Sequence, residues 1–137
     1  MLKKIARTLL VLVGLYVVGL VVATALYPRL LFPSPVNPPP IPPGVGTPIT
    51  ATAADGVIAN GLFFPPKDPN APVVAFFHGN GETVSYDLWR ADVLQAMGYG
   101  ALLVEYRGYG TAKANASPSE QGLYADADAE LGVLEKD

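Results

Sequence analysis

The uncharged run from Leu9 to Leu26 constrains this chain more than any other feature, because it is apolar on every face. As a helix rising ~1.5 Å per residue, it would cover about 27 Å, close to the ~30 Å hydrocarbon core of a bilayer. Three basic residues precede the run, and basic flanks favour the cytoplasmic side. We therefore expect residues 9–26 to contact the membrane as a single-pass anchor, with a cytoplasmic N-terminus and an extracytoplasmic domain.

Two other interpretations of the run remain open. Ala23-Thr24-Ala25 has the small-x-small pattern of a signal-peptidase site, so the protein could be secreted after cleavage following Ala25. Against this, the run is longer than the usual core of a signal peptide, about 7–15 residues. A buried core helix is the third interpretation, although the run is apolar all round. The retained anchor is the preferred one.

Proline dominates the segment that follows. Eight prolines and no charged residue lie between Pro33 and Pro48. Because proline fixes φ and removes the backbone donor, such a segment favours extended polyproline geometry over a packed element. We expect a semi-rigid spacer, and hence three parts. These are a cytoplasmic tip and transmembrane anchor at 1–28, a Pro-rich spacer at 29–47 and a partial domain at 48–137.

Charge and cysteine content exclude several functions. Beyond Arg29 the chain carries five basic and twelve acidic residues, a net charge of −7, which argues against a nucleic-acid partner. With no cysteine and one histidine, it has no disulfide, thiol nucleophile, zinc-thiolate site or His-rich metal site. Asp126, Asp128 and Glu130 would lie around a helix beside a solvated face. We therefore expect neither a metal nor a cofactor.

The pattern after the spacer predicts strands. Short strands are expected at 49–53 and 57–64, joined by a hairpin at Asp55-Gly56. Continuous apolar runs predict two more strands, at 73–77 and 100–105, and such runs are typical of strands covered on both faces.

Two helices are predicted around the last strand. One is expected at 85–97, with Gly98 ending it. The second would be capped by Ser117, with Glu120 closing a capping box. Its apolar face would carry Leu123, Ala127, Leu131 and Leu134. The order strand, helix, strand, helix after a hairpin predicts an α/β fold with parallel central strands.

Three motifs carry a resemblance to a known family. FFHGNGE at 76–82, EYRGYG at 105–110 and PSEQGLYADA at 118–127 resemble the α/β-hydrolase superfamily, most closely its membrane-anchored, serine aminopeptidase-like branch. The resemblance implies the N-terminal half of an α/β-hydrolase sheet, mainly parallel and starting with an antiparallel hairpin, after an N-terminal transmembrane helix. It also implies that the strand at 73–77 is an exposed edge in this chain.

The first motif implies an oxyanion-hole loop. In such enzymes a serine attacks a carbonyl carbon, and backbone donors after the third strand stabilise the developing oxyanion. By resemblance the donor lies within 80–82, and His78 organises the loop instead of acting as the base. A histidine merely satisfied at a strand end is the alternative. Glu82 would oppose the oxyanion if it pointed inward, and we expect it to face solvent. The implied loop is His78, Gly79, Asn80, Gly81 and Glu82.

The second motif implies a turn that borders the site, formed by Arg107, Gly108, Tyr109 and Gly110. Arg107 is expected to pair with a nearby carboxylate more than to contact substrate.

No catalytic triad is expected within this chain. None of its four serines lies in the G-x-S-x-G frame, and the resemblance places nucleophile, acid and base downstream. We therefore expect the N-terminal part of a membrane-anchored serine hydrolase. When completed, it would cleave an ester, amide or peptide bond through an acyl-enzyme. The alternatives are a non-catalytic membrane-tethered binding module and one half of a split hydrolase.

Overall fold

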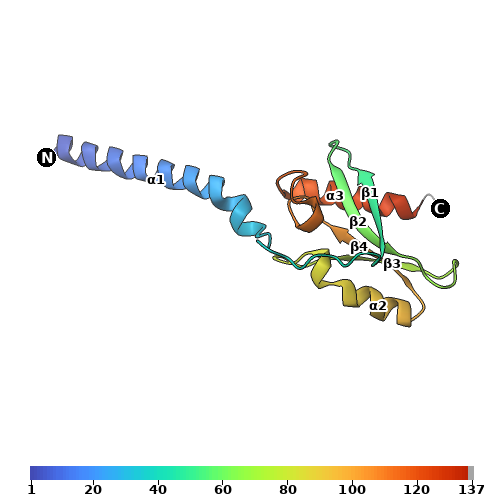
Figure 1. Cartoon of the computed structure of the whole chain (residues 1–137). Coiled ribbons are helices and arrows are strands. Elements are labelled where there is room, and N and C mark those ends of the chain that lie inside the picture. The colour runs from blue at the N-terminus through green and yellow to red at the C-terminus, as the bar shows by residue number, and fades with distance from the viewer. Residues whose placement is uncertain (136–137) are drawn as a thin grey trace. The chain divides into compact units, whose positions relative to one another are not determined.

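The computed structural model describes residues 1–135, apart from the side chain of Leu2. The last two residues of the domain expected at 48–137 lie outside the described residues. The chain divides into two compact units, residues 1–32 and the residues from Pro33 onward (Figure 1).

The first unit is helix α1, Leu2–Leu31. Its side chains from Lys3 onward are exposed, and it is long and apolar enough to cross a membrane, a property that a signal sequence shares. The helix extends beyond the apolar run of residues 9–26 at both ends, so it also includes the basic residues that flank the run. The hydroxyl of Thr8 donates to the carbonyl of Lys4, four residues back, and Arg29 in the last turn suits the negative end of the helix dipole.

The second unit is built on a four-stranded mixed sheet in the order β1-β2-β4-β3. The strands are β1 (Thr47–Thr52), β2 (Ile58–Phe64), β3 (Val73–Phe77) and β4 (Gly100–Glu105). The α/β class is confirmed. The expectation of a mainly parallel sheet is not confirmed, because β2 runs antiparallel to both of its neighbours and only β3 and β4 are parallel.

The predicted hairpin joins β1 to β2. Thr52 and Ile58 face each other across it, and a carboxylate oxygen of Asp55 accepts a hydrogen bond from the amide of Val57 at 3.2 Å. Gly56 has a φ of +83°, which a residue without Cβ adopts at little cost. The Asp-Gly pair therefore makes the turn that its composition predicts.

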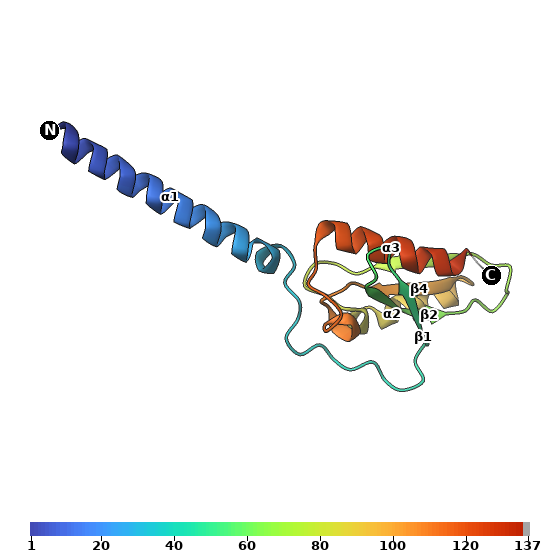
Figure 2. The same cartoon turned by 90° about the horizontal axis from the view of Figure 1, so that it is seen from above.

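Helices α2 (Leu88–Ala96) and α3 (Glu120–Leu134) cover opposite faces of the sheet (Figure 1; Figure 2). All six residues of β4 are buried, and alternate ones serve the two faces. Leu103 packs in a core cluster with Ala91 of α2, whereas Leu102 lies against Gly61 on the face that holds Glu130 of α3.

Strand β3 is not covered as its apolar composition predicts. Among the strands of residues 1–135 it pairs only with β4, so it forms one edge of the sheet, and Val74 remains 37% exposed. The edge position that the family resemblance implies is confirmed.

Both helices begin differently from expectation. Residues Val84–Tyr86 form a short 3-10 turn, η1, and α2 starts after it at Leu88. Ser119, and not Ser117, caps α3, since its hydroxyl oxygen accepts a hydrogen bond from the amide of Gly122 at 3.2 Å.

The face that α3 buries was also predicted wrongly. Its buried residues are Gly122, Asp126 and Glu130, whereas Leu131 is 37% exposed. The expectation that Asp126 and Glu130 lie on a solvated face is therefore wrong. The ion pair of Asp126 with Arg107, described below, is what allows one of these carboxylates to be buried.

Part of the Pro-rich segment packs against the sheet. Ile41 and Val45 are half-buried against the core cluster that contains Leu62 and Phe64. Residues between the prolines therefore contribute to the core of the second unit.

Candidate functional site

The two predicted site segments meet at one edge of the sheet. Strand β3 ends at Phe77 and β4 ends at Glu105, and the two strands are parallel. Because carboxyl ends of neighbouring parallel strands face the same side, the loop at 78–82 lies beside the turn at 106–110. Ligand sites of open α/β sheets occur at this edge.

His78 is the centre of this region. Its ring is buried, and Nδ1 lies 3.0 Å from the carbonyl oxygen of Gly79, to which it donates. Nε2 lies 3.2 Å from a carboxylate oxygen of Glu105 and 3.5 Å from the amide nitrogen of Tyr106. A protonated ring donates from Nε2 to Glu105, and a neutral ring can accept from the amide of Tyr106 instead.

The buried carboxylate favours the charged form of His78. Burial is the largest single influence and would lower the pKa of the imidazole. The hydrogen bonds with Glu105 and with the carbonyl of Gly79, together with the charges of Glu105 and Asp87, outweigh it, so the pKa is raised above its usual 6.5. His78 and Glu105 therefore form a buried ion pair that holds the start of the loop against the end of β4.

Glu105 also contacts the segments on either side. Its oxygens lie 3.4 Å from the amide of Val84 and 3.4 Å from the amide of Thr111, at the outer limit of a hydrogen bond. Gly110 lies directly against this carboxylate, where a Cβ would have no room. The turn after β4 therefore needs glycine at this position.

The loop at 78–82 is closed by its own side chain. Gly81 has a φ of +78°, and the amide of Glu82 donates to the carbonyl of Gly79 at 3.2 Å. The carboxylate of Glu82 turns back and accepts from the amide of Gly79 at 2.9 Å. We expected Glu82 to face solvent, but its carboxylate folds back onto the loop and places a negative charge there.

Two tyrosines pack around the histidine. The ring centroids of Tyr106 and Tyr109 lie 4.8 and 5.1 Å from that of His78. The hydroxyl of Tyr109 donates to the side-chain oxygen of Asn80 at 3.3 Å. Burial raises the pKa of both tyrosines, so they remain neutral donors. This contact joins the turn after β4 to the loop after β3.

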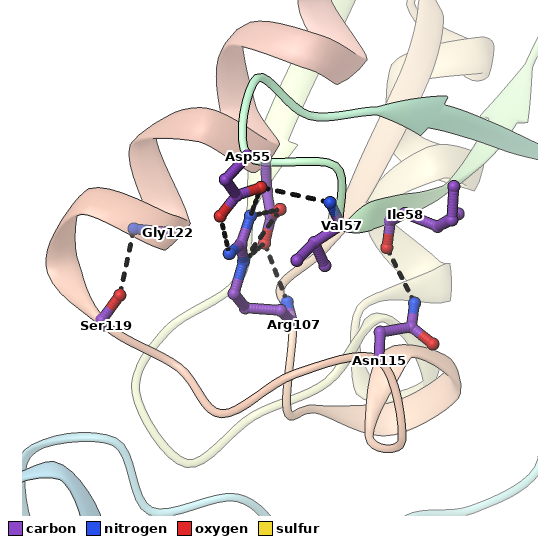
Figure 3. A network of polar contacts seen from close by, with 8 residues as sticks. Asp55, Val57, Ile58, Arg107, Asn115, Ser119 and Gly122 are labelled. Atoms are coloured by element: carbon purple, nitrogen blue, oxygen red, sulfur yellow. Dashed lines mark hydrogen bonds and ion pairs between the residues drawn. The ribbon is translucent and has the colours of Figure 1, made fainter.

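Arg107 connects the hairpin to α3 (Figure 3). Its guanidinium donates to Asp126 at 2.6 Å and to Asp55, and its backbone amide donates to Asp126 at 3.0 Å. The predicted pairing with a carboxylate is confirmed, with two carboxylates instead of one. The hydrogen bonds from Arg107 lower the pKa of Asp55. The hydrogen bonds to Asp126 and Asp55 raise the pKa of the guanidinium.

Glu130 lies one helical turn beyond Asp126 and has no such partner. It is fully buried, and neither carboxylate oxygen has a hydrogen-bond partner among residues 1–135. Burial, and then the charge of Asp126, raise the pKa of Glu130 to about 7.

Sequence reasoning missed Glu105 and the tyrosine packing. One signal was available: His78 follows the expected strand at 73–77 and Glu105 ends the one at 100–105, so parallel pairing of the two would bring these residues together. The register, with Phe77 opposite Val104, does so. No group of three potential metal ligands occurs among residues 1–135.

Comparison with known proteins supports the fold. Two structures of the Pyrococcus furiosus esterase Pf2001 superpose with TM-scores of 0.53 and 0.52 at 18% identity. They cover 75% and 74% of this chain, and 42% and 43% of the esterase. The second unit thus has an esterase-like fold.

Sequence relatives are uninformative about activity. Two Mycobacterium tuberculosis proteins, the uncharacterized proteins MT2364 and Rv2307c of different strains, are 36% identical over 83 residues, 60% of this chain. The matched region spans only 29% of the length of these relatives. No family model matches the chain.

Proposed function

We propose that this chain is the N-terminal part of a membrane-anchored serine hydrolase of the serine aminopeptidase-like branch. Residues 9–26 anchor it, with the N-terminus in the cytoplasm, and the loop at 78–82 supplies half of the oxyanion hole. Serine, acid and histidine come from outside these 137 residues. The complete enzyme cleaves an ester, amide or peptide bond through an acyl-enzyme, and this chain alone is inactive.

The observation that carries the proposal is the placement of the loop. It follows β3 at the carboxyl edge of an esterase-like sheet, held there by the 3.2 Å contact between His78 and Glu105. Backbone amides of a Gly-containing loop at this edge are the donors that acyl transfer requires. By resemblance the donor lies within 80–82, and the bond from the amide of Glu82 to the carbonyl of Gly79 must open if that amide is to serve an oxyanion.

The experiment uses a serine-directed fluorophosphonate probe on native membranes, followed by capture with an antibody to residues 85–98. A captured, labelled protein supports the proposal. The purified 137-residue chain should not be labelled, since none of its serines is activated. Labelling of the purified chain would place a nucleophile within it and overturn the assignment.

A split hydrolase, or a binding module, is the second candidate, and the free edge of the second unit favours it. In the part of the chain that the structure describes, strand β3 has no second neighbour. An apolar stripe along α2 and its C-cap stays exposed, with Trp89 at 54%, Val93 at 47% and Met97 at 64%. A separate polypeptide adding a strand and a helix would cover both surfaces. Capture of a 14.4 kDa chain together with a labelled partner would select this candidate.

A further inference from the structure

A pocket of about 370 Å³ lies between the Pro-rich segment and the α2 face of the sheet. Its size is in the range of small-molecule sites, about 300–1,000 Å³. Apolar side chains of Ile41, Val45 and Leu62 line one part. Ile41, Val45 and Leu62 also belong to the packed core or lie against it, so these walls are fixed by the fold.

The polar groups of the pocket gather at its other end. Asn60 and Glu105 are opposite one another in the register of β2 and β4, and Thr111 follows the turn after β4. The amide of Thr111 lies 3.4 Å from Glu105. Because His78 pairs with the same carboxylate, this end carries little net charge and suits a neutral polar group.

A second pocket, of about 200 Å³, continues from the polar end. It shares Ile41, Glu105 and Thr111 with the first and reaches Ser85 and Gly110. The two pockets together, called the hollow below, begin at the apolar walls and pass the carboxylate of Glu105, which is paired with His78. They end at Gly110, in the turn beside the oxyanion-hole loop.

We propose that this hollow binds the aliphatic chain of the substrate, an ester or amide of an unbranched acyl or alkyl group. The identity of the ligand as substrate rests on the proposed hydrolase function, whereas the binding itself does not. With a methylene given the ~30 Å³ of a water molecule in the liquid, the larger pocket holds a chain of up to roughly twelve carbons, so a ten-carbon chain fits. The polar end of the ligand then lies at Glu105 and Thr111, facing the loop.

The test is photolabelling of the full chain, reconstituted in amphipol, with a ten-carbon alcohol that carries a terminal diazirine. Peptide mapping compares labelling of residues 41–62 with labelling of α1, which serves as the internal measure of non-specific partitioning. We expect saturable labelling of residues 41–62 that excess unlabelled decanol removes. Labelling confined to α1, or not removed by decanol, would overturn the proposal.

Two exposed threonines of β1 provide matched variants. Thr50 lines the larger pocket, whereas Thr52 lies on the same side of the strand outside the lining. Thr50→Trp should reduce labelling of residues 41–62 about tenfold by filling the pocket, and Thr52→Trp should leave it within about twofold. Equal labelling of the two variants would contradict the proposal.

The readout separates this inference from the proposed function. Pocket labelling without fluorophosphonate reactivity in native membranes would retain the aliphatic site and reject the hydrolase. Fluorophosphonate reactivity without pocket labelling would retain the hydrolase and reject the aliphatic site.

Discussion

Nε2 of His78 lies 3.2 Å from a carboxylate oxygen of Glu105, and both side chains are almost completely buried. The two residues end neighbouring parallel strands, so the pair fixes the loop after β3 relative to the turn after β4. The geometry of the candidate oxyanion-hole loop therefore depends on a contact between residues 27 positions apart in the chain.

This ion pair predicts a raised pKa for the only histidine of the chain. Titration of the imidazole C–H resonances of tag-free protein should give a pKa above 6.5, and Glu105→Gln should lower it. Because the folded-state pKa is the higher one, the stabilisation from His78 is complete below pH 6.5 and is lost as pH rises through the folded value. A wild-type pKa below 6.5 would contradict the pairing.

Because Arg107 bonds two carboxylates, we expect even its conservative substitution by lysine to destabilise the protein strongly. Arg107→Lys cannot keep both the bidentate contact with Asp126 and the contact with Asp55, and should cost about 3 kcal/mol in the free energy of unfolding. Denaturant unfolding followed by the fluorescence of Trp89 measures it. The control is Lys113→Met at an exposed position, for which we expect less than about 0.5 kcal/mol.

Because Glu130 is fully buried, we expect the free energy of unfolding to fall as pH rises. Its pKa is raised from 4.5 to about 7 in the folded state, so the protonated form stabilises the fold below pH 4.5. That contribution, about 3 kcal/mol, disappears as pH rises to about 7. Glu130→Leu should remove this part of the pH dependence, leave the part that comes from His78, and stabilise the protein at pH 8.

The matched control for Glu130 is Asp128→Asn on the same helix, where the side chain is exposed. Unfolding curves between pH 5 and pH 8 should keep the wild-type slope in this variant. If Glu130→Leu also keeps that slope, the buried carboxylate is not its source.

The open edge of β3 predicts self-association of the isolated chain. Lysine on an edge strand opposes edge-to-edge pairing, so Val74→Lys should reduce light scattering by the detergent-solubilised protein about twofold or more. Thr52→Lys, on the opposite edge strand, should have a smaller effect. A monodisperse wild-type chain would show that the β3 edge does not associate.

Local signals account for the parts of the fold that were predicted well. The strands at 73–77 and 100–105 have the expected bounds because each is a continuous apolar run. The Asp55-Gly56 turn carries its own conformational signature. These features depend on residues next to one another in the chain.

Longer-range contacts account for what was missed. The burial of Asp126 depends on Arg107, 19 residues earlier, and the packing of Ile41 on Leu62 depends on how the Pro-rich segment folds back. Neither periodicity nor composition identifies such partners.

The most direct test of the central claim is the mass of the native protein in its own membranes, detected with the antibody to residues 85–98. The account predicts a band at about twice the 14.4 kDa of this chain. The same 83 residues make up 60% of this chain and 29% of the curated relatives, so these relatives are about twice as long as this chain. That band should also react with the fluorophosphonate. A single band at 14.4 kDa that neither reacts nor captures a reactive partner would contradict the account.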